Sequence, residues 1–229
     1  MNLVAPIGIL MLDTRFERIV GDVGHPASFA FPVLYRIVAG ASARRVVLER
    51  AEGLLGPFID AARALQAEGV AGISTTCGFL AGFQDELCDA LEVPVLTSSL
   101  LQVGLVQRCL PAARRVGILT IARAGLTPAL LAAAGVPSDT PIGATDPDGA
   151  FNAAILGDAP LDVAAARREH VAAAERLLAE HPEVGAIVLE CTNMPPYAAA
   201  IAQATGVPVF SVIDLICWFQ AGLRPARAG

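Results

Sequence analysis

The stretch Gly69-Val-Ala-Gly-Ile-Ser-Thr-Thr-Cys77-Gly-Phe79 has a counterpart later in the chain, Glu183-Val-Gly-Ala-Ile-Val-Leu-Glu-Cys191-Thr-Asn193. Each is a short apolar run that ends in a cysteine and leads into a helical pattern. The two cysteines lie 114 residues apart, and so do Val93-Pro-Val-Leu96 and Val207-Pro-Val-Phe210. Near the start of each half, Ile7-Gly-Ile-Leu10 resembles Val116-Gly-Ile-Leu119 at an offset of 109 residues. Three landmarks in the same order indicate a diverged internal duplication.

Apolar strand patterns alternate with alanine-rich helical patterns in both halves, which is typical of parallel sheets covered by helices on both faces. We therefore expect an α/β fold with two pseudo-symmetric lobes, an N-terminal repeat over 1–112 and a C-terminal repeat over 113–229, whose last helix is free to pack back on the first lobe. The expected strands are 5–12, 45–48, 71–76, 94–97, 115–121, 141–145, 185–190 and 208–211. The expected helices are 53–67, 78–90, 99–110, 127–134, 163–180, 195–204 and 214–223.

Two segments interrupt this alternation. Residues 13–44 form a long insert that contains Phe29 and Phe31, and residues 146–162 form a shorter one. Loops of this length in a compact α/β chain serve as lids or binding loops, or they decorate the surface, and the sequence leaves both readings open.

The amino-acid composition excludes several classes of function. The 229 residues carry a net charge of −6 without a long basic cluster, so nucleic acid and anionic membranes are not expected partners. All 16 basic residues are arginine, which excludes chemistry that needs a lysine Schiff base. No apolar run reaches the roughly 18 to 20 residues of a membrane span, and the apolar opening Leu3 to Leu12 lacks a basic leader, so a cytoplasmic protein is the default expectation.

The five cysteines are expected to be reduced thiols, because their number is odd and no C-x-x-C pair occurs. With only three scattered histidines, we expect no metal site. We interpret Cys88, Cys109 and Cys217 as core residues of apolar helices.

Cys77 and Cys191 each follow a strand and begin a helix, where backbone N–H groups point outward at the carboxyl edge of a parallel sheet. We expect the helix dipole to lower the pKa of each thiol, and the same N–H groups to hold a carboxylate. Two opposed thiols suit a reaction in which one thiolate removes the proton next to a carboxylate and the other thiol returns a proton to the opposite face. Burial as small apolar residues is the alternative for each cysteine taken singly.

The two cysteine segments and the internal repeat resemble the aspartate/glutamate racemase superfamily, which also includes hydantoin racemases, maleate cis-trans isomerases and arylmalonate decarboxylases. The resemblance covers essentially the whole chain. It implies a site in the cleft between the lobes, a homodimer or higher homo-oligomer, a small carboxylate substrate and no cofactor. It also implies that Cys77 and Cys191 are the acid/base thiols, and that the substrate is held by Asp13, Thr14, Thr76, Gly78, Phe79, Thr120, Thr192 and Asn193.

Several other polar residues are suited either to such a site or to a purely structural role. Arg15 is suited either to a substrate carboxylate or to a surface ion pair. Glu190 either hydrogen-bonds the neighbouring Cys191 or satisfies a nearby backbone or hydroxyl group. His170 is predicted to lie on a solvated helix face, and His25 is the histidine with some chance of approaching the site.

The sequence departs from glutamate racemases, which usually carry Asp-Ser-Gly-x-Gly after the first strand and Cys-Asn-Thr at the first cysteine. Here the corresponding residues are Asp13-Thr14-Arg15-Phe16 and Cys77-Gly78-Phe79, which argues against glutamate as the substrate. Phe79, together with Phe29 and Phe31 if they face the pocket, would make it more apolar.

The leading hypothesis is a cofactor-independent racemase or epimerase, an isomerase that inverts the α-carbon of an amino acid, a hydantoin or a related carboxylate. A maleate-type isomerase with a nucleophilic cysteine is an alternative. An arylmalonate-type decarboxylase resembles the chain less, because that group keeps one of the two cysteines. A small-carboxylate binding protein without catalytic activity is the third possibility.

Overall fold

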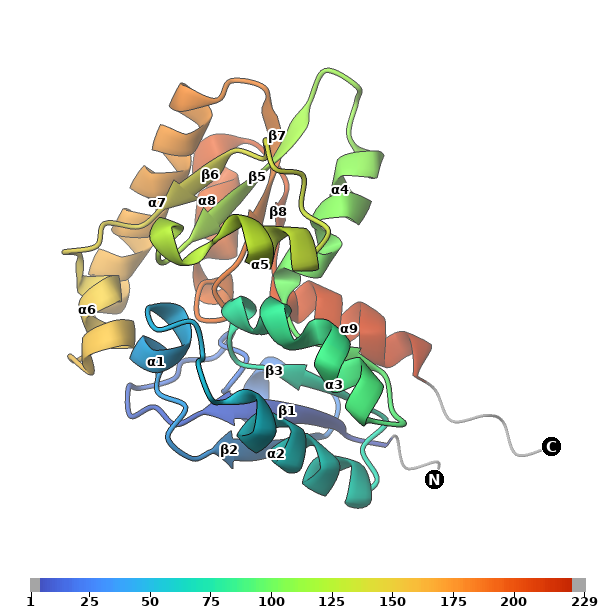
Figure 1. Cartoon of the computed structure of the whole chain (residues 1–229). Helices are drawn as coiled ribbons and strands as arrows, with labels where there is room; N and C mark the ends of the chain where they lie inside the picture. The colour runs from blue at the N-terminus through green and yellow to red at the C-terminus, as the bar shows by residue number, and fades with distance from the viewer. Residues whose placement is uncertain (1–4, 224–229) are drawn as a thin grey trace.

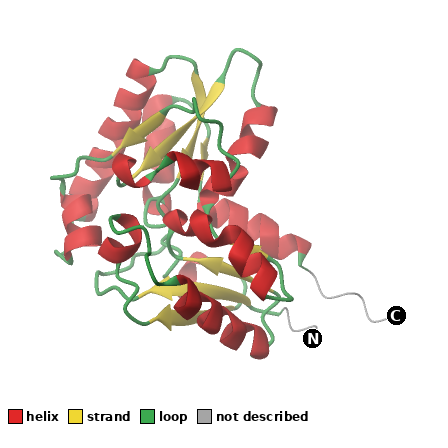
Figure 2. Cartoon of the chain, viewed as in Figure 1, coloured by secondary structure: helices red, strands yellow, loops and turns green. Residues whose placement is uncertain are grey.

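Two four-stranded parallel sheets organise the chain, and the computed structural model describes residues 5–223 (Figures 1 and 2). The strands of the first sheet stand in the order β2-β1-β3-β4, and those of the second in the order β6-β5-β7-β8. Equivalent strands therefore occupy equivalent positions, as a duplicated α/β chain predicts. The strands are β1 (Ile7–Leu12), β2 (Val33–Val38), β3 (Gly72–Thr75), β4 (Val95–Leu96), β5 (Arg115–Thr120), β6 (Ile142–Ala144), β7 (Val184–Leu189) and β8 (Val209–Phe210).

Helices cover the sheets and connect their strands (Figure 1). The α-helices are α1 (Ala43–Val47), α2 (Leu55–Ala67), α3 (Gln84–Ala90), α4 (Val103–Cys109), α5 (Pro128–Ala133), α6 (Ala150–Gly157), α7 (Val163–Glu180), α8 (Ala198–Thr205) and α9 (Val212–Gly222). Short 3-10 turns are η1 (Pro26–Ser28), η2 (Gly78–Phe83), η3 (Ser99–Gln102), η4 (Arg123–Gly125) and η5 (Pro195–Tyr197).

Matched glycines let one helix approach the central strand of each sheet closely. A Cβ at Gly8 in β1 would lie 3.0 Å from the side chain of Leu65 on α2. A Cβ at Gly117 in β5 would lie 3.0 Å from the side chain of Leu177 on α7. In each lobe, a glycine at the same strand position therefore lets a leucine of the covering helix pack closely on the sheet. This match supports an origin of the two lobes by duplication.

The last helix, α9, packs on the sheet of the first lobe. Its Val212 and Ile216 are fully buried and form one apolar cluster with Ile7 and Ile9 of β1. Gly72 of β3 admits the side chains of Phe219 and Leu223, since a Cβ there would overlap both. The C-terminal segment thus crosses from the second lobe to the first and fixes one against the other (Figure 1).

One predicted strand is wrong. Residues 45–48 were expected to be a strand because of Val46 and Val47, but residues 43–47 form α1, whose N-terminus is capped by the Ser42 hydroxyl accepting the Arg45 N–H at 3.2 Å. The edge strand is β2, which lies inside residues 13–44, the segment expected to be a long insert. The helix α6 was likewise missed within residues 146–162.

The other predicted strands and helices agree with the structure to within about two residues at most ends. The chain passes from the first sheet to the second between α4 and β5. Residues 1–4 and 224–229, which the prediction assigned to the outer ends of the two repeats, lie outside the described residues. Within residues 5–223, no helix is both long and apolar enough to cross a membrane.

Candidate active site

The two cysteines occupy matching corners at the carboxyl ends of β3 and β7. In each corner the cysteine carbonyl accepts an N–H three residues later, Leu80 N–H at 3.1 Å after Cys77 and Met194 N–H at 3.0 Å after Cys191. Both side chains are almost completely buried, with exposed fractions of 6% and 7%. A tight turn rather than a long helix therefore follows each cysteine.

Direct hydrogen bonds join the two corners. The Thr192 hydroxyl donates to the Thr76 carbonyl at 2.6 Å, and the Ser99 hydroxyl donates to the Leu189 carbonyl at 2.7 Å. The Thr76 hydroxyl accepts the Leu12 N–H at 3.0 Å, which ties its corner to the end of β1. The relative position of the two thiols is thus fixed by buried hydrogen bonds between the lobes.

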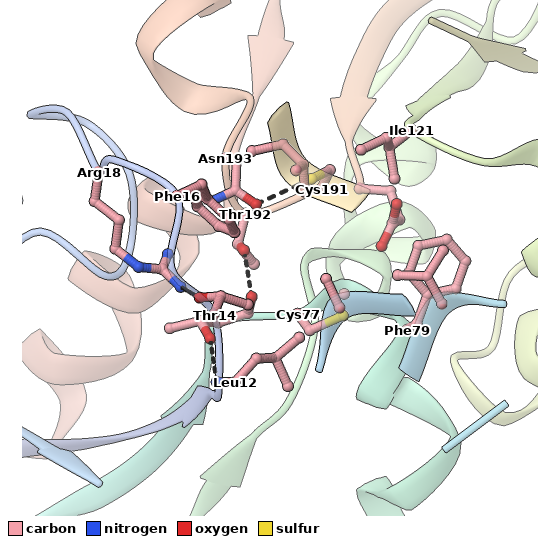
Figure 3. A pocket seen from close by; sticks show the side chains of 16 residues that line it. Leu12, Thr14, Phe16, Arg18, Cys77, Phe79, Ile121, Cys191, Thr192 and Asn193 are labelled. Carbon is pink, nitrogen blue, oxygen red and sulfur yellow. Dashed lines mark hydrogen bonds between the residues drawn. The ribbon is translucent and has the colours of Figure 1, made fainter. Parts of the chain in front are cut away.

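Both thiols open into one small pocket between the lobes, with an empty volume of about 340 Å³ (Figure 3). Eight residues predicted from the sequence line this inter-lobe pocket: Thr14, Thr76, Cys77, Gly78, Phe79, Cys191, Thr192 and Asn193. The pocket lies between the two lobes and is lined by side chains of both, an arrangement suited to a small molecule rather than a polymer.

Two predicted site residues do not line the pocket. Asp13 is exposed, and its carboxylate accepts the Gly40 N–H at 3.2 Å, so it stabilises a surface loop. Thr120 is buried behind the pocket and donates its hydroxyl proton to Glu190 Oε2 at 2.7 Å. Thr120 thus acts on the site through Glu190, and the prediction of Asp13 as a lining residue was wrong.

The pocket has further lining residues that the sequence-based site did not include. They are Leu12, Phe16, Arg18, Ala43, Val47, Ile121, Ile155 and Glu190. Six of the eight are apolar, and three of these six, Ala43, Val47 and Ile155, lie on α1 and α6, two helices that were not predicted.

Arg18, and not the neighbouring Arg15, brings a positive charge to the pocket. Its guanidinium pairs with Asp22 at 2.8 Å, donates to the Thr14 hydroxyl at 2.9 Å and lies 4.6 Å from the centre of the Phe16 ring. Asp22 is buried and also accepts the Asn193 side-chain amide at 2.5 Å. This ion pair therefore connects the first-lobe loop to the Cys191 corner. The four-residue spacing of Arg18 and Asp22 is a weak sequence signal for it.

Glu190 is a fully buried carboxyl group in the wall of the pocket. One oxygen accepts the Thr120 hydroxyl, and the other has no hydrogen-bond partner among the described residues. A Cβ at Gly78 would overlap the carboxyl and carbonyl oxygens of Glu190, so glycine is needed for the two corners to approach. Burial raises the pKa of Glu190 to about 8, and the Thr120 hydrogen bond opposes that rise.

The expectation of low thiol pKa values is wrong. Burial, and then the charge of Glu190, raise the pKa of Cys77, while N–H groups of Phe79 and Leu80 lower it by less. The pKa of Cys191 is raised by the same two causes and lowered by the Asn193 N–H. Desolvation by burial therefore outweighs the backbone N–H groups at both corners, and it raises the pKa of each thiol above its ordinary value.

Several aromatic and histidine predictions also change. Phe29 and Phe31 pack against the α9 cluster and do not line the pocket. His25 caps the turn η1 instead of reaching the site. His170, expected on a solvated face, is fully buried and stacks on the Tyr197 ring at 4.4 Å, and burial lowers its pKa to about 4.

The remaining cysteines are not core residues. Cys88, Cys109 and Cys217 are all exposed, because each lies on the outer side of its helix. Within residues 5–223, no group of three or more histidine, cysteine or acidic side chains is arranged to hold a metal ion.

Comparison with solved structures identifies the fold. A glutamate racemase from Bacillus anthracis has a TM-score of 0.60 at 12% identity, covering 96% of this chain and 84% of that one. Unliganded arylmalonate decarboxylase has a TM-score of 0.56 at 18% identity, covering 98% and 97%. An aspartate racemase from Picrophilus torridus has a TM-score of 0.56 at 12% identity, covering 96% and 93%. The protein has the fold of the aspartate/glutamate racemase superfamily.

Sequence comparison identifies the family within this superfamily fold. Dimethylsulfoniopropionate lyase 7 of Emiliania huxleyi is 33% identical over 229 residues, covering 95% of this chain and 67% of the relative. The dimethylsulfoniopropionate lyase of Durusdinium sp. clade D is 32% identical over 232 residues, covering 95% and 75%. No protein-family model matches the chain. The chain belongs to the dimethylsulfoniopropionate lyase family and is an enzyme.

Proposed function

We propose that this enzyme is a lyase that cleaves dimethylsulfoniopropionate, or a close relative with a sulfonium group two carbons from a carboxylate. The observation that carries the proposal is the pair of buried thiols, Cys77 and Cys191, in one small pocket that also contains the Arg18 guanidinium. The names of the relatives that share a third of the sequence support this choice of substrate.

The reaction begins at the carbon next to the carboxylate. A cysteine thiolate removes a proton there, and the electron pair of the broken C–H bond forms a double bond to the neighbouring carbon. The bond from that carbon to sulfur breaks, and its electron pair leaves with neutral dimethyl sulfide. The other product is acrylate, and the thiol later passes its proton to solvent.

The carboxylate of the substrate is proposed to bind at the Arg18 side of the pocket. Arg18 supplies a guanidinium, and Thr14 and Asn193 supply polar side chains beside it. Positive charge here stabilises the negative charge that develops on the carboxylate when the α-proton leaves. The Arg18–Asp22 ion pair holds the guanidinium in place before the substrate arrives.

Binding of the substrate favours formation of the thiolate that acts as the base. Both thiols have a raised pKa because they are desolvated and lie near Glu190. A sulfonium cation bound in the same pocket favours the negatively charged thiolate, since it supplies the opposite charge in a medium of low dielectric constant. Proton removal is thus coupled to the presence of a cationic leaving group.

Racemisation is a second candidate function, favoured by one specific observation. Cys77 comes from the first lobe and Cys191 from the second, so the two thiols reach the pocket from opposite corners. Inversion of a stereocentre needs two such groups, whereas elimination needs one base.

A single proton NMR experiment in heavy water separates the two functions. The purified protein is incubated with dimethylsulfoniopropionate in one sample and with aspartate, glutamate and hydantoins in others. The proposal predicts the vinyl protons of acrylate and an equal amount of dimethyl sulfide in the first sample. Loss of α-proton signals from an amino acid or hydantoin, without acrylate in the first sample, would instead establish the racemase.

A further inference from the structure

The inter-lobe pocket has two chemically different ends (Figure 3). Arg18, Phe16 and Asn193 lie on one side, Phe79 and Ile121 lie on the other, and the two cysteines lie between them. The first end carries the Arg18 guanidinium, which is paired with Asp22 and offers further N–H donors to an anion.

Glu190 supplies the acidic group at the second end, and this group is negatively charged once it has lost its proton. Its carboxyl group accepts a hydrogen bond from Thr120 and lies against Gly78, the residues that directly precede Ile121 and Phe79. The side chain is fully buried, and its Oε1 has no hydrogen-bond partner among the described residues. A buried carboxyl oxygen without a partner is costly, so an interaction with a ligand would offset that cost.

The surroundings of Glu190 favour a cation without hydrogen-bond donors. Phe79 offers an aromatic ring, and Ile121 and Val47 offer apolar surface. A methylated onium group matches this wall, because its methyl groups pack on apolar side chains while its charge is attracted to the ring face and to the carboxylate. A primary ammonium group would leave its N–H donors facing apolar side chains.

We propose that Glu190 and Phe79 form a subsite for the methylated, positively charged end of the substrate, opposite the carboxylate subsite at Arg18. This inference rests on the proposed function, because it assigns the two ends of the same small zwitterion. It makes Glu190 a specificity-determining residue that selects an onium group over a neutral group of the same shape.

The affinity of this subsite for an onium ligand should depend on pH. Burial raises the pKa of Glu190 to about 8, so below that pH a bound cation must displace a proton from the carboxyl group. The other titratable or charged groups around the pocket are the Cys77 and Cys191 thiols, whose pKa values are also raised, and the Arg18–Asp22 ion pair. Affinity for an onium ligand should therefore rise with pH by up to about tenfold per unit below 8 and then level off.

The test compares two unreactive ligands by isothermal titration calorimetry at pH 8. One is 3-(trimethylammonio)propanoate, and the other is its carbon analogue 4,4-dimethylpentanoate, which keeps the carboxylate but has an uncharged tert-butyl group in place of the onium group. The wild-type protein should bind the onium ligand at least about tenfold more tightly. Glu190→Gln should remove most of this preference while changing the affinity for 4,4-dimethylpentanoate by less than about threefold.

Two further variants keep the result interpretable. Glu17→Gln removes an exposed carboxylate outside the pocket and should leave the preference unchanged. Phe79→Leu keeps an apolar side chain but removes the ring, and it should reduce the preference by about threefold or more even if Glu190→Gln folds poorly. Thermal melting checks that each variant is folded.

Each outcome has a definite meaning. Equal affinity of the wild-type protein for both ligands, or an undiminished onium preference in both Glu190→Gln and Phe79→Leu, overturns the subsite and leaves the proposed function standing. A clear onium preference without turnover of dimethylsulfoniopropionate supports the subsite and removes the proposed function. Failure of both ligands to bind the folded wild-type protein overturns both.

Discussion

The Thr192 hydroxyl donates a 2.6 Å hydrogen bond to the Thr76 carbonyl, across 116 residues of sequence and from one lobe to the other. Each residue is the immediate neighbour of a pocket cysteine. The bond therefore connects the two thiol-bearing corners directly, without a helix or a loop between them. This contact explains how two separate sheets can hold one small site in a fixed geometry.

Replacement of Thr192 by valine should loosen this connection. The shape is kept, but a buried carbonyl loses its donor, which costs about 1 to 3 kcal/mol of unfolding free energy. Urea denaturation measures the loss, and Thr192→Ser, which keeps the hydroxyl, should retain most of the stability. Equal stability of the valine variant and the wild type would mean that the bond contributes nothing.

Gly78 is predicted to tolerate no side chain. A methyl group there would overlap the carboxyl and carbonyl oxygens of Glu190 and push the two corners apart. Gly78→Ala should therefore lower turnover by about tenfold or more, because a small displacement of reacting groups has a large effect on rate. Gly82→Ala is the matched control on the same turn, since a Cβ at Gly82 meets no described atom within 4 Å. Equal rates for the two variants would contradict this close approach.

The pocket thiols should react slowly with alkylating reagents. Cys77 and Cys191 are buried and their pKa values are raised, whereas Cys88 and Cys109 are exposed. At pH 7.5, iodoacetamide should label the exposed pair at least about tenfold faster, as measured by mass spectrometry of peptides. Faster labelling of Cys77 or Cys191 in the ligand-free protein would show that the thiols are ionised there.

Glu190 should make the protein less stable as the pH rises. Its pKa is about 8 in the folded protein and close to the ordinary value of 4.5 in the unfolded chain, because burial disfavours the charged form. Between these values the unfolded chain has lost a proton that the native protein retains, so the unfolding free energy falls as pH increases. The wild type should lose about 1 to 4 kcal/mol relative to Glu190→Gln between pH 5 and pH 8.

Urea denaturation at several pH values measures this difference. Glu175→Gln, which changes an exposed carboxylate on α7, is the control. Its unfolding free energy should change with pH in the same way as that of the wild type. A constant difference between wild type and Glu190→Gln across this range would mean that the buried carboxyl group has an ordinary pKa.

The thiol corners could be predicted from the sequence because a local pattern, repeated at a fixed offset, specifies them. Cys77 and Cys191 each follow an apolar strand and precede a turn, and strand ends converge at one edge of a parallel sheet. Thr192 and Asn193 follow from the same pattern. The duplicated topology and the lining residues next to the cysteines were therefore accessible without a structure.

Other parts of the site depend on tertiary contacts that have no local pattern. Arg18 reaches the pocket because Asp22 is buried against Asn193, which lies 171 residues away. Val46 and Val47 favour a strand by composition, but Ser42 caps a helix there and β2 occupies the sheet edge. Glu190 was expected to satisfy a neighbouring hydroxyl group, and it does bond Thr120, but its place in the pocket wall follows from the approach of Gly78.

The most direct test of the central claim is the rate of acrylate formation from dimethylsulfoniopropionate by the wild type and by Cys77→Ser, Cys191→Ser and Cys88→Ser. The claim is that a pocket thiol removes the proton next to the carboxylate. It predicts acrylate from the wild type and from Cys88→Ser, and a loss of at least about 100-fold when the pocket thiol that acts as the base is replaced. The absence of acrylate with folded wild-type protein, or full activity in both pocket variants, would contradict it.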